Sequence, residues 1–238
     1  MKKYLAEFLG TFLLVFFGIW SIEYSNVHLS ENFQASLWLI TVVFGLVVTL
    51  AILMFGNISG AHINPAVSIA FYYNKSLTSA ELIFYIISQC FGAIIGAYLF
   101  NLIYPSEFIG TTLPSVSVPL ACLFELILSV ILMMVIFWIA DPSNKYNKLA
   151  PYVIGFQVAF NTYIVGLLTS VSMNPARSIG PALVSGHWEY YWIYLIAPIS
   201  GMIISFNIWT KIKDQKWRKT YSYYAQAIVA GVKWRKHT

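Results

Sequence analysis

The tripeptide Asn-Pro-Ala occurs twice in the chain, as Asn64-Pro65-Ala66 and as Asn174-Pro175-Ala176. Asparagine is a strong helix N-cap, and proline fits the first helical position, where its missing N–H costs no hydrogen bond. Each motif therefore predicts the start of a helix. The apolar stretches that follow, at about 65–73 and 175–184, are too short to cross a bilayer, which needs about 20 residues.

The side-chain amides of Asn64 and Asn174 could donate hydrogen bonds to the oxygen atom of a small solute. Two short helices that enter a membrane from opposite faces would bring their positive N-terminal ends together near the midplane and repel cations. A single Asn-Pro-Ala could equally be an ordinary junction between a loop and a helix. Two copies at matching places favour a pore that passes neutral solutes and excludes protons and ions.

The composition indicates where these motifs lie. Hydrophobic residues make up 59% of the 238 residues, charged residues make up 10%, and the mean hydropathy is +0.71. A water-soluble domain carries about a quarter charged residues, so lipid must solvate most of this chain. No acidic or basic low-complexity run points to nucleic acid. Six apolar segments are long enough to span a bilayer: about 4–22, 35–56, 80–104, 119–140, 149–170 and 189–210.

The basic residues predict the orientation of these spans. When the spans are counted from the N terminus, 13 of the 14 Lys and Arg residues fall on one side of the membrane. The connections on the other side, 23–34 and 105–118, contain none. We therefore predict an integral protein of a plasma or inner membrane. The positive-inside rule places both of its termini in the cytoplasm. The exception is Arg177, which lies in the second short apolar segment.

The two halves of the chain share a pattern. Ala6-Glu7-Phe8-Leu9 opens the first span, and Leu123-Phe124-Glu125-Leu126 lies near the start of the fourth. Each half, about 1–118 and 119–210, has three spans, an odd number, so the second half is inverted relative to the first. We predict an all-α membrane domain over 1–210, with six transmembrane helices and two re-entrant half-helices.

The remaining segment, 211–238, is predicted to be a basic, aromatic cytoplasmic tail. Its composition suits a position on the membrane surface and a solvated tail equally well. On the third span, Gly92 and Gly96 belong to overlapping small-x-x-x-small pairs, which predict close helix packing inside the subunit or between subunits. On the sixth span, the aromatic cluster that includes Tyr194 is interpreted as an anchor at the membrane interface.

Three stretches resemble the aquaporin family (major intrinsic proteins): Ser-Gly-Ala-His-Ile-Asn-Pro-Ala-Val at 59–67, Asn-Pro-Ala-Arg-Ser at 174–178, and the opening of the first span at 6–11. The resemblance covers about 4–210. It implies a pore in each subunit, a homotetramer in the lipid bilayer, and water and small neutral solutes as the permeants. It also implies that Glu7 and Glu125 brace the re-entrant loops, although Glu7 could instead lie at the headgroup level.

The resemblance further implies an outer constriction, whose residues are found by their spacing from the two motif asparagines. These residues are Phe44, Thr162, Val171 and Arg177. The fixed charge of Arg177 would repel cations and donate to solute oxygens. Water-selective members typically carry His where Thr162 stands, so a wider ring is expected here. Leakage of ammonia, urea or peroxide should accompany water, with weaker passage of glycerol.

Other functions remain as alternatives. Ser178 and Ala182 resemble the water-channel pattern, but Tyr194 and Leu195 match it only partly, so a glycerol facilitator of the same family is one alternative. An ion-coupled secondary transporter also uses inverted repeats and broken helices. A structural junction protein with a closed pore is a third. No cluster of His, Asp or Glu offers metal ligands or a nucleophile with its base, so we expect no enzyme, metal or cofactor.

Overall fold

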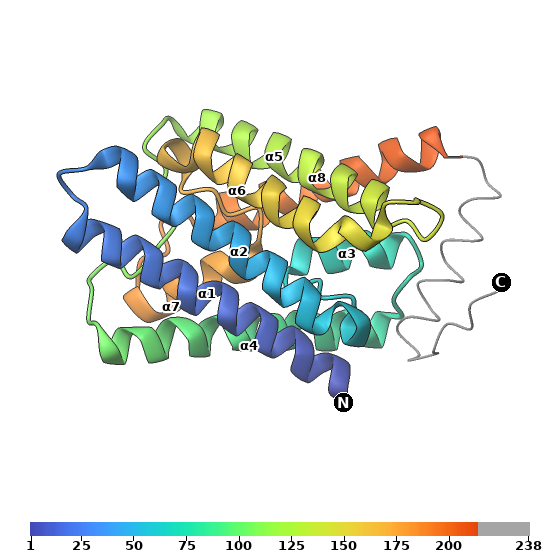
Figure 1. Cartoon of the computed structure of the whole chain (residues 1–238), viewed down its shortest axis with the longest axis horizontal. Helices are drawn as coiled ribbons and strands as arrows, with labels where there is room; N and C mark the ends of the chain where they lie inside the picture. Colours follow the sequence, from blue (N-terminus) through green and yellow to red (C-terminus); the bar gives the residue numbers. More distant parts are fainter. Residues whose placement is uncertain (214–238) are drawn as a thin grey trace.

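A computed structural model describes residues 1–213, and within them the chain forms eight α-helices, a short 3-10 turn at Asn147–Leu149 and no strand (Figure 1). The helices are α1 (Lys2–His28), α2 (Phe33–Ser59), α3 (Pro65–Tyr73), α4 (Ser79–Ile103), α5 (Val118–Ile139), α6 (Ala150–Thr169), α7 (Pro175–Ser185) and α8 (Tyr191–Ile212). Six of them are long and apolar enough to cross a membrane: all except α3 and α7. The predicted all-α membrane fold is confirmed.

The first helix is longer than its apolar run indicates. The sequence predicted a break from Glu23 onward, but α1 continues to His28. Two buried polar residues near this end of the helix, Ser21 and Glu23, have hydrogen-bond partners inside the protein. Ser21 donates to the carbonyl of Gly18 at 2.7 Å, and the carboxyl group of Glu23 accepts the Gly110 N–H at 3.2 Å. These two side chains therefore add no unpaired polar group to the buried face of α1.

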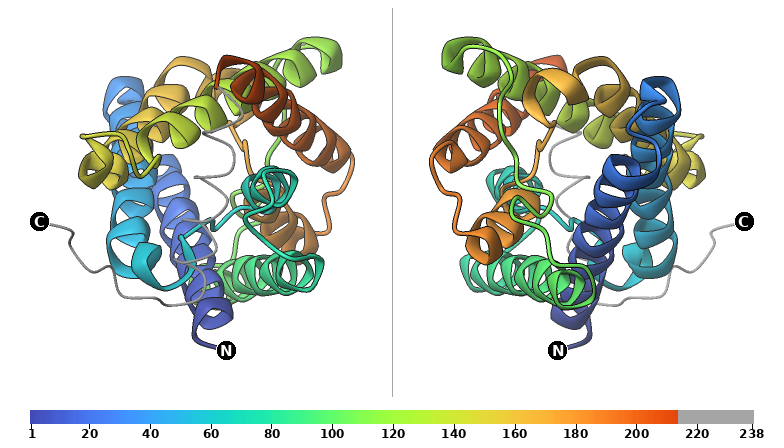
Figure 2. Two further views of the ribbon diagram at one scale, coloured as in Figure 1. Left: turned by 90° about the vertical axis from the view of Figure 1, so that its right-hand side faces the viewer. Right: turned by 90° about the vertical axis from the view of Figure 1, so that its left-hand side faces the viewer.

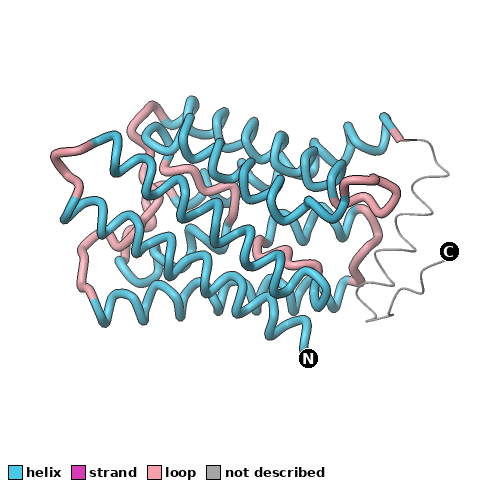
Figure 3. The backbone as a smooth tube through the Cα atoms, viewed as in Figure 1, coloured by secondary structure: helices cyan, strands magenta, loops and turns pink. Residues whose placement is uncertain are grey.

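The two short helices lie toward opposite ends of the molecule (Figure 1). Seen end-on, the long helices surround the interior, and α3 and α7 lie between α4 and α8 (Figure 2), against which both short helices pack. The segments that precede α3 and α7 run as loops inside the bundle (Figure 3). Non-helical backbone at membrane depth must be enclosed by protein, and the six long helices provide that enclosure.

Glycines allow the two halves to use the same close helix contact. A Cβ atom on Gly92 of α4 would lie 2.3 Å from the Phe8 carbonyl oxygen of α1. A Cβ atom on Gly201 of α8 would lie 2.5 Å from the Leu126 carbonyl oxygen of α5. Both distances are too short for any side chain, so the backbones approach each other directly. The small residues on the third span thus pack inside the subunit.

The N terminus and the end of α8 lie at the same end of the molecule (Figure 1), as an even number of spans requires. Of the predicted tail 211–238, residues 214–238 lie outside the described part. The outer faces of the long helices carry large exposed apolar side chains that suit contact with lipid. Examples are Leu46, Phe91, Ile131, Phe156, Ile164 and Ile196.

Candidate functional site

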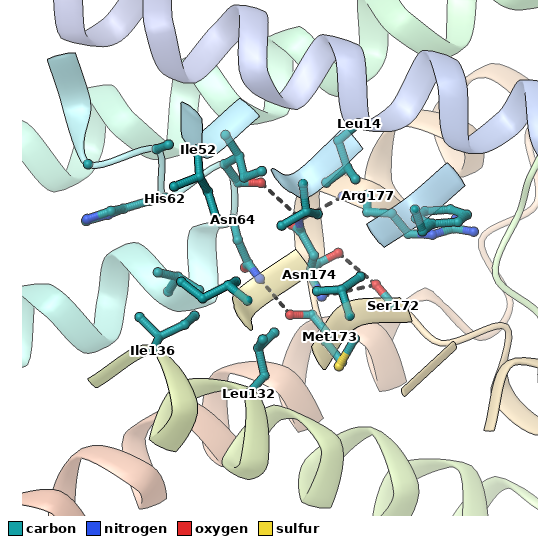
Figure 4. Close-up of a pocket in the computed structure, with 18 of the residues that line it drawn as sticks. Leu14, Ile52, His62, Asn64, Leu132, Ile136, Ser172, Met173, Asn174 and Arg177 are labelled. Carbon is teal, nitrogen blue, oxygen red and sulfur yellow. Dashed lines mark hydrogen bonds between the residues drawn. The ribbon is translucent and has the colours of Figure 1, made fainter. Parts of the chain in front are cut away.

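A cavity of about 140 Å³ lies where the two halves meet. Its wall is mostly apolar and includes Val48, Ile52, Leu132, Ile136, Ile154 and Val158. The polar side chains on the wall are His62, Asn64, Thr162, Ser172, Asn174 and Arg177. Figure 4 shows His62 at one end, Arg177 at the other, and the two asparagines between them. Polar groups therefore lie at a few defined levels of an otherwise apolar wall.

The two motif asparagines hold each other's loops. The Asn64 amide donates to the carbonyl of Met173 at 2.7 Å, and the Asn174 amide donates to the carbonyl of Ile63 at 2.8 Å (Figure 4). Their side-chain oxygens cap the two half-helices by accepting the N–H groups of Ala66 at 2.9 Å and Ala176 at 3.0 Å. Each amide carries a second N–H, for which residues 1–213 supply no acceptor. These two donors can bind an oxygen atom in the cavity.

The loops before the asparagines have an unusual backbone. Ala61 and Ile63 have positive φ angles of 47° and 44°, and the equivalent Val171 and Met173 have φ angles of 24° and 50°. A positive φ is uncommon for a residue with a side chain, and for a β-branched residue such as Ile63 or Val171 it is a genuine outlier. Such conformations persist only where the surroundings impose them.

Glu7 of α1 supplies these surroundings for the first loop. Its carboxyl group is fully buried. One oxygen accepts from the Ser59 hydroxyl at 2.6 Å and the His62 N–H at 2.9 Å, and the other accepts from the Ile63 N–H at 2.6 Å and the Gln89 amide at 2.8 Å. All four partners are donors, so Glu7 acts purely as an acceptor. The structure therefore buries Glu7 inside the bundle, against the loop that precedes α3.

Glu125 of α5 does the same for the second loop. One oxygen accepts from the Thr169 hydroxyl and from the Ser172 N–H, both at 2.9 Å, and the other accepts from the Met173 N–H at 2.8 Å. The pattern of donors repeats that around Glu7, except that no amide corresponds to Gln89. The two buried glutamates therefore hold equivalent loops in equivalent ways.

Two tyrosines complete this arrangement. The Tyr85 hydroxyl donates to the Ser59 carbonyl at 2.7 Å, and the Tyr194 hydroxyl donates to the Thr169 carbonyl at 2.8 Å. Both side chains are 0% exposed. The interpretation of Tyr194 as a membrane-interface anchor was wrong, because the hydropathy pattern does not show which face of a helix is buried. Sequence analysis missed Tyr85 and Gln89 because polar residues on an apolar helix carry no motif of their own.

The four residues expected at the outer constriction all line the same cavity. The Arg177 guanidinium carbon lies 5.4 Å from the centre of the Phe44 ring. The Thr162 hydroxyl donates to the carbonyl of Val158 in its own helix at 2.9 Å. Its single hydrogen is therefore used, and toward the cavity Thr162 can only accept a hydrogen bond. Val171 adds an apolar side chain to this ring.

Arg177 lies in the first turn of α7 and is almost fully buried. Its Nη1 donates to the carbonyl of Gly110 at 2.7 Å, and its Nε has no partner among residues 1–213. Gly110 belongs to the connection between α4 and α5. Sequence analysis did not identify Gly110, because a lone glycine in a connecting loop carries no specific signal.

At the other end of the cavity, His62 packs against α3. Its ring stacks on Phe71 with a centroid distance of 4.5 Å, and its Nδ1 lies 3.1 Å from the Ser68 hydroxyl. In the second half, Ser172 contacts the Ser178 hydroxyl at 2.6 Å in the equivalent place. Within the described residues, no group of three or more His, Cys, Asp or Glu side chains could hold a metal ion.

Comparison with known proteins places this geometry in context. The family model for the major intrinsic protein matches residues 1–209. The chain is 37% identical over 211 residues to aquaporin-4 of Mus musculus, covering 86% of this chain and 65% of that protein, which is less than two thirds of its length. It is 36% identical over 208 residues to nodulin-26 of Glycine max, covering 85% of this chain and 74% of that protein. Among solved structures, the aquaglyceroporin from Plasmodium falciparum superposes with a TM-score of 0.80 at 26% identity, covering 89% of this chain and 96% of the other.

Proposed function

Since the chain belongs to the major intrinsic protein family, a family of channels and not of enzymes, we propose that it is a passive transmembrane channel whose main permeant is water. The observation that carries this proposal is the reciprocal placement of Asn64 and Asn174. Both side chains lie on the wall of one cavity at the N-terminal ends of α3 and α7. Both offer an N–H to an oxygen atom at the same level.

These donors also support the exclusion of protons. A water molecule whose oxygen accepts from both amides has its own hydrogens directed away from them, along the passage. The neighbouring wall is apolar, so water in the passage has few other partners. The N-terminal ends of α3 and α7 add two partial positive charges at this level. Hydronium and metal cations are therefore disfavoured where water is held best.

Arg177 adds a second barrier to cations. Its guanidinium carries a fixed charge and lies against Phe44 at one end of the cavity. Beside it, Thr162 and Val171 are small side chains, so the ring they form with Phe44 leaves more room than one that contains His in place of Thr162. We propose that ammonia, urea or peroxide passes with water and that glycerol passes less well.

A glycerol facilitator is the second candidate, because the superposing solved structure is named an aquaglyceroporin. Phe44 and Val171 supply only part of the apolar wall that a glycerol carbon backbone requires, and the acceptor-only Thr162 hydroxyl supplies one polar contact. These features favour water as the main permeant. An ion-coupled transporter is not favoured, because both carboxylate oxygens of Glu7 and of Glu125 already accept hydrogen bonds from the loops before α3 and α7.

The assembly and orientation form a further part of the proposal. As a member of this family with six apolar spans, the chain is an integral membrane protein. The distribution of Lys and Arg supports a cytoplasmic location for both termini. The exposed apolar faces of the long helices allow four copies to pack side by side in the bilayer, with a pore in each.

Stopped-flow light scattering on vesicles that contain the purified protein tests the proposal. After an osmotic step, these vesicles should shrink much faster than empty vesicles while still holding an imposed pH gradient. Uptake of urea and glycerol is measured in the same vesicles. Shrinkage no faster than that of empty vesicles would favour the closed structural protein. Solute flux that saturates and depends on an ion gradient would favour the transporter.

A further inference from the structure

The connection between α4 and α5 reaches the candidate constriction through Gly110. The carbonyl of this residue accepts the hydrogen bond from Arg177 Nη1 at 2.7 Å, and its N–H donates to the carboxyl group of Glu23 at 3.2 Å. Gly110 therefore links a side chain of α1 to the cationic group that lines the cavity. This link joins three segments that are far apart in the sequence.

Gly110 lies directly against α1. Its φ angle is +63°, and a Cβ atom at this position would lie 2.7 Å from Ile19 Cγ1 of α1. The preceding residue, Ile109, is fully buried. A glycine fits this left-handed backbone and close approach, whereas a residue with a side chain would be displaced. The backbone that carries the carbonyl for Arg177 therefore lies close to α1, where its N–H reaches Glu23.

Glu23 is 6% exposed, although an acidic side chain on an apolar helix is expensive to bury. An ionisable residue buried in a membrane protein is by default a candidate for a functional role, with its partner to be identified. Here the partner is the Gly110 N–H. Glu23 belongs neither to the Asn-Pro-Ala motifs nor to the four constriction residues, so these do not explain why it is buried.

The equivalent residue of the second half is Asp141, which stands as far after Glu125 as Glu23 stands after Glu7. Asp141 is 2% exposed, but it holds its own turn. One oxygen accepts from the N–H and the hydroxyl of Ser143, both at 3.0 Å, and the other lies 3.7 Å from Lys213 Nζ. Within residues 1–213, the hydrogen bonds and ion pair of Asp141 involve neither Gly110 nor Arg177, so the two halves use the same position differently.

We propose that Glu23 is a positioning residue that fixes Gly110 and, through it, the guanidinium of Arg177, and thereby helps to set which solutes pass. Within residues 1–213, the Gly110 carbonyl is the one hydrogen-bond acceptor of the guanidinium, which also faces the Phe44 ring. Loss of the Glu23 contact removes the hydrogen bond that ties the Gly110 backbone to α1, so that Gly110 and the Arg177 side chain bound to it can shift from the constriction. This inference rests on the proposed channel function.

The test compares Glu23→Ala with the native protein in vesicles, measuring glycerol uptake and osmotic water flux on the same preparation. We expect the ratio of glycerol permeability to water permeability to rise about fivefold, which is the change in an equilibrium that the loss of one typical hydrogen bond produces. Glu23→Gln keeps a side-chain oxygen that can accept from Gly110 and should retain a ratio close to the native one. Asp141→Ala removes an equally buried carboxyl group away from Arg177 and should leave the ratio unchanged.

A double-mutant cycle separates positioning from general damage. In an Arg177→Ala background, Glu23→Ala should have no further effect on the ratio, because the group that Glu23 positions is absent. The proposal is overturned if Glu23→Ala leaves or lowers the ratio, if Asp141→Ala raises it equally, or if the effect persists without Arg177. If Glu23→Ala does not fold, Glu23→Asp, which withdraws the carboxyl group by one methylene, should raise the ratio instead. Failure of the channel function itself is distinct, because the native protein would then show no flux above that of empty vesicles.

Discussion

Gly18 of α1 leaves the space that the Phe44 ring occupies, so Gly18→Ala should disturb the candidate constriction directly. A Cβ atom at Gly18 would lie 2.6 Å from Phe44 Cζ and 2.9 Å from Cε1. Carbon atoms in contact prefer about 3.5–4.0 Å, so the ring must shift by roughly 1 Å. Phe44 lines the cavity beside Arg177. A ring pushed off α1 therefore moves toward the permeation path.

The effect on stability can be estimated separately from the effect on flux. Overpacking of this kind costs about 1–3 kcal/mol, and replacing a helical glycine with alanine returns roughly 0.5–1 kcal/mol. We expect a net destabilisation of about 1 kcal/mol, with a clear loss of water permeability per folded channel. Thermal unfolding in detergent and stopped-flow light scattering measure the two quantities.

Gly56→Ala is a matched control in α2. A Cβ atom there would meet only Ile52 Cγ2, at an ordinary 3.5 Å. This variant should be as stable as the native protein or more stable, and its water permeability should be unchanged. Native water permeability in Gly18→Ala, or an equal loss in both variants, would refute the reasoning that Gly18 makes room for Phe44.

Three other predictions concern the same cavity. Thr162→His should narrow the ring and suppress urea flux more than water flux, because a larger side chain replaces a small one; equal suppression in the vesicle assay would contradict this. Asn174→Ala should lower the free energy of unfolding by about 2 kcal/mol, because α7 loses its N-cap and the Ile63 carbonyl loses its donor. An unfolding midpoint like that of the native protein would count against the reciprocal contact. Tyr85→Phe and Tyr194→Phe should each lower the free energy of unfolding by a similar amount, about 1 kcal/mol, because each removes one equivalent hydrogen bond. Clearly unequal unfolding midpoints would show that the two loops are not held alike.

The six spans and the two half-helices were predictable because long apolar runs and Asn-Pro pairs are local signals. The family prediction is confirmed by the matching family model. The end of α1 was not predictable, because the partner of the buried Glu23 lies in a loop that follows much later in the sequence. Gly110 was missed for the same reason. Its importance depends on contacts with α1 and α7, and none of these appears in its neighbouring residues.

The direction in which Tyr194 points was also beyond sequence reasoning. Its neighbour Trp192 is 46% exposed, whereas Tyr194 is fully buried, although both lie in one aromatic cluster. The packing of α8 against its neighbours, chiefly α5, decides which of them is buried. Local composition identifies such a cluster, but tertiary contacts assign the role of each member.

The reciprocal contact between the asparagines has a consequence for how the chain is made. A ribosome delivers the first half before the second, so α3 and its loop exist before residue 173 has been synthesised. Until then the Asn64 amide lacks the Met173 carbonyl, which follows 109 residues later, and the Ile63 carbonyl lacks its donor from Asn174. The two hydrogen bonds at the centre of the pore can therefore form only after both halves are in the bilayer. Assembly of this centre is thus a late step of biogenesis, in which each half supplies the partner that the other lacks.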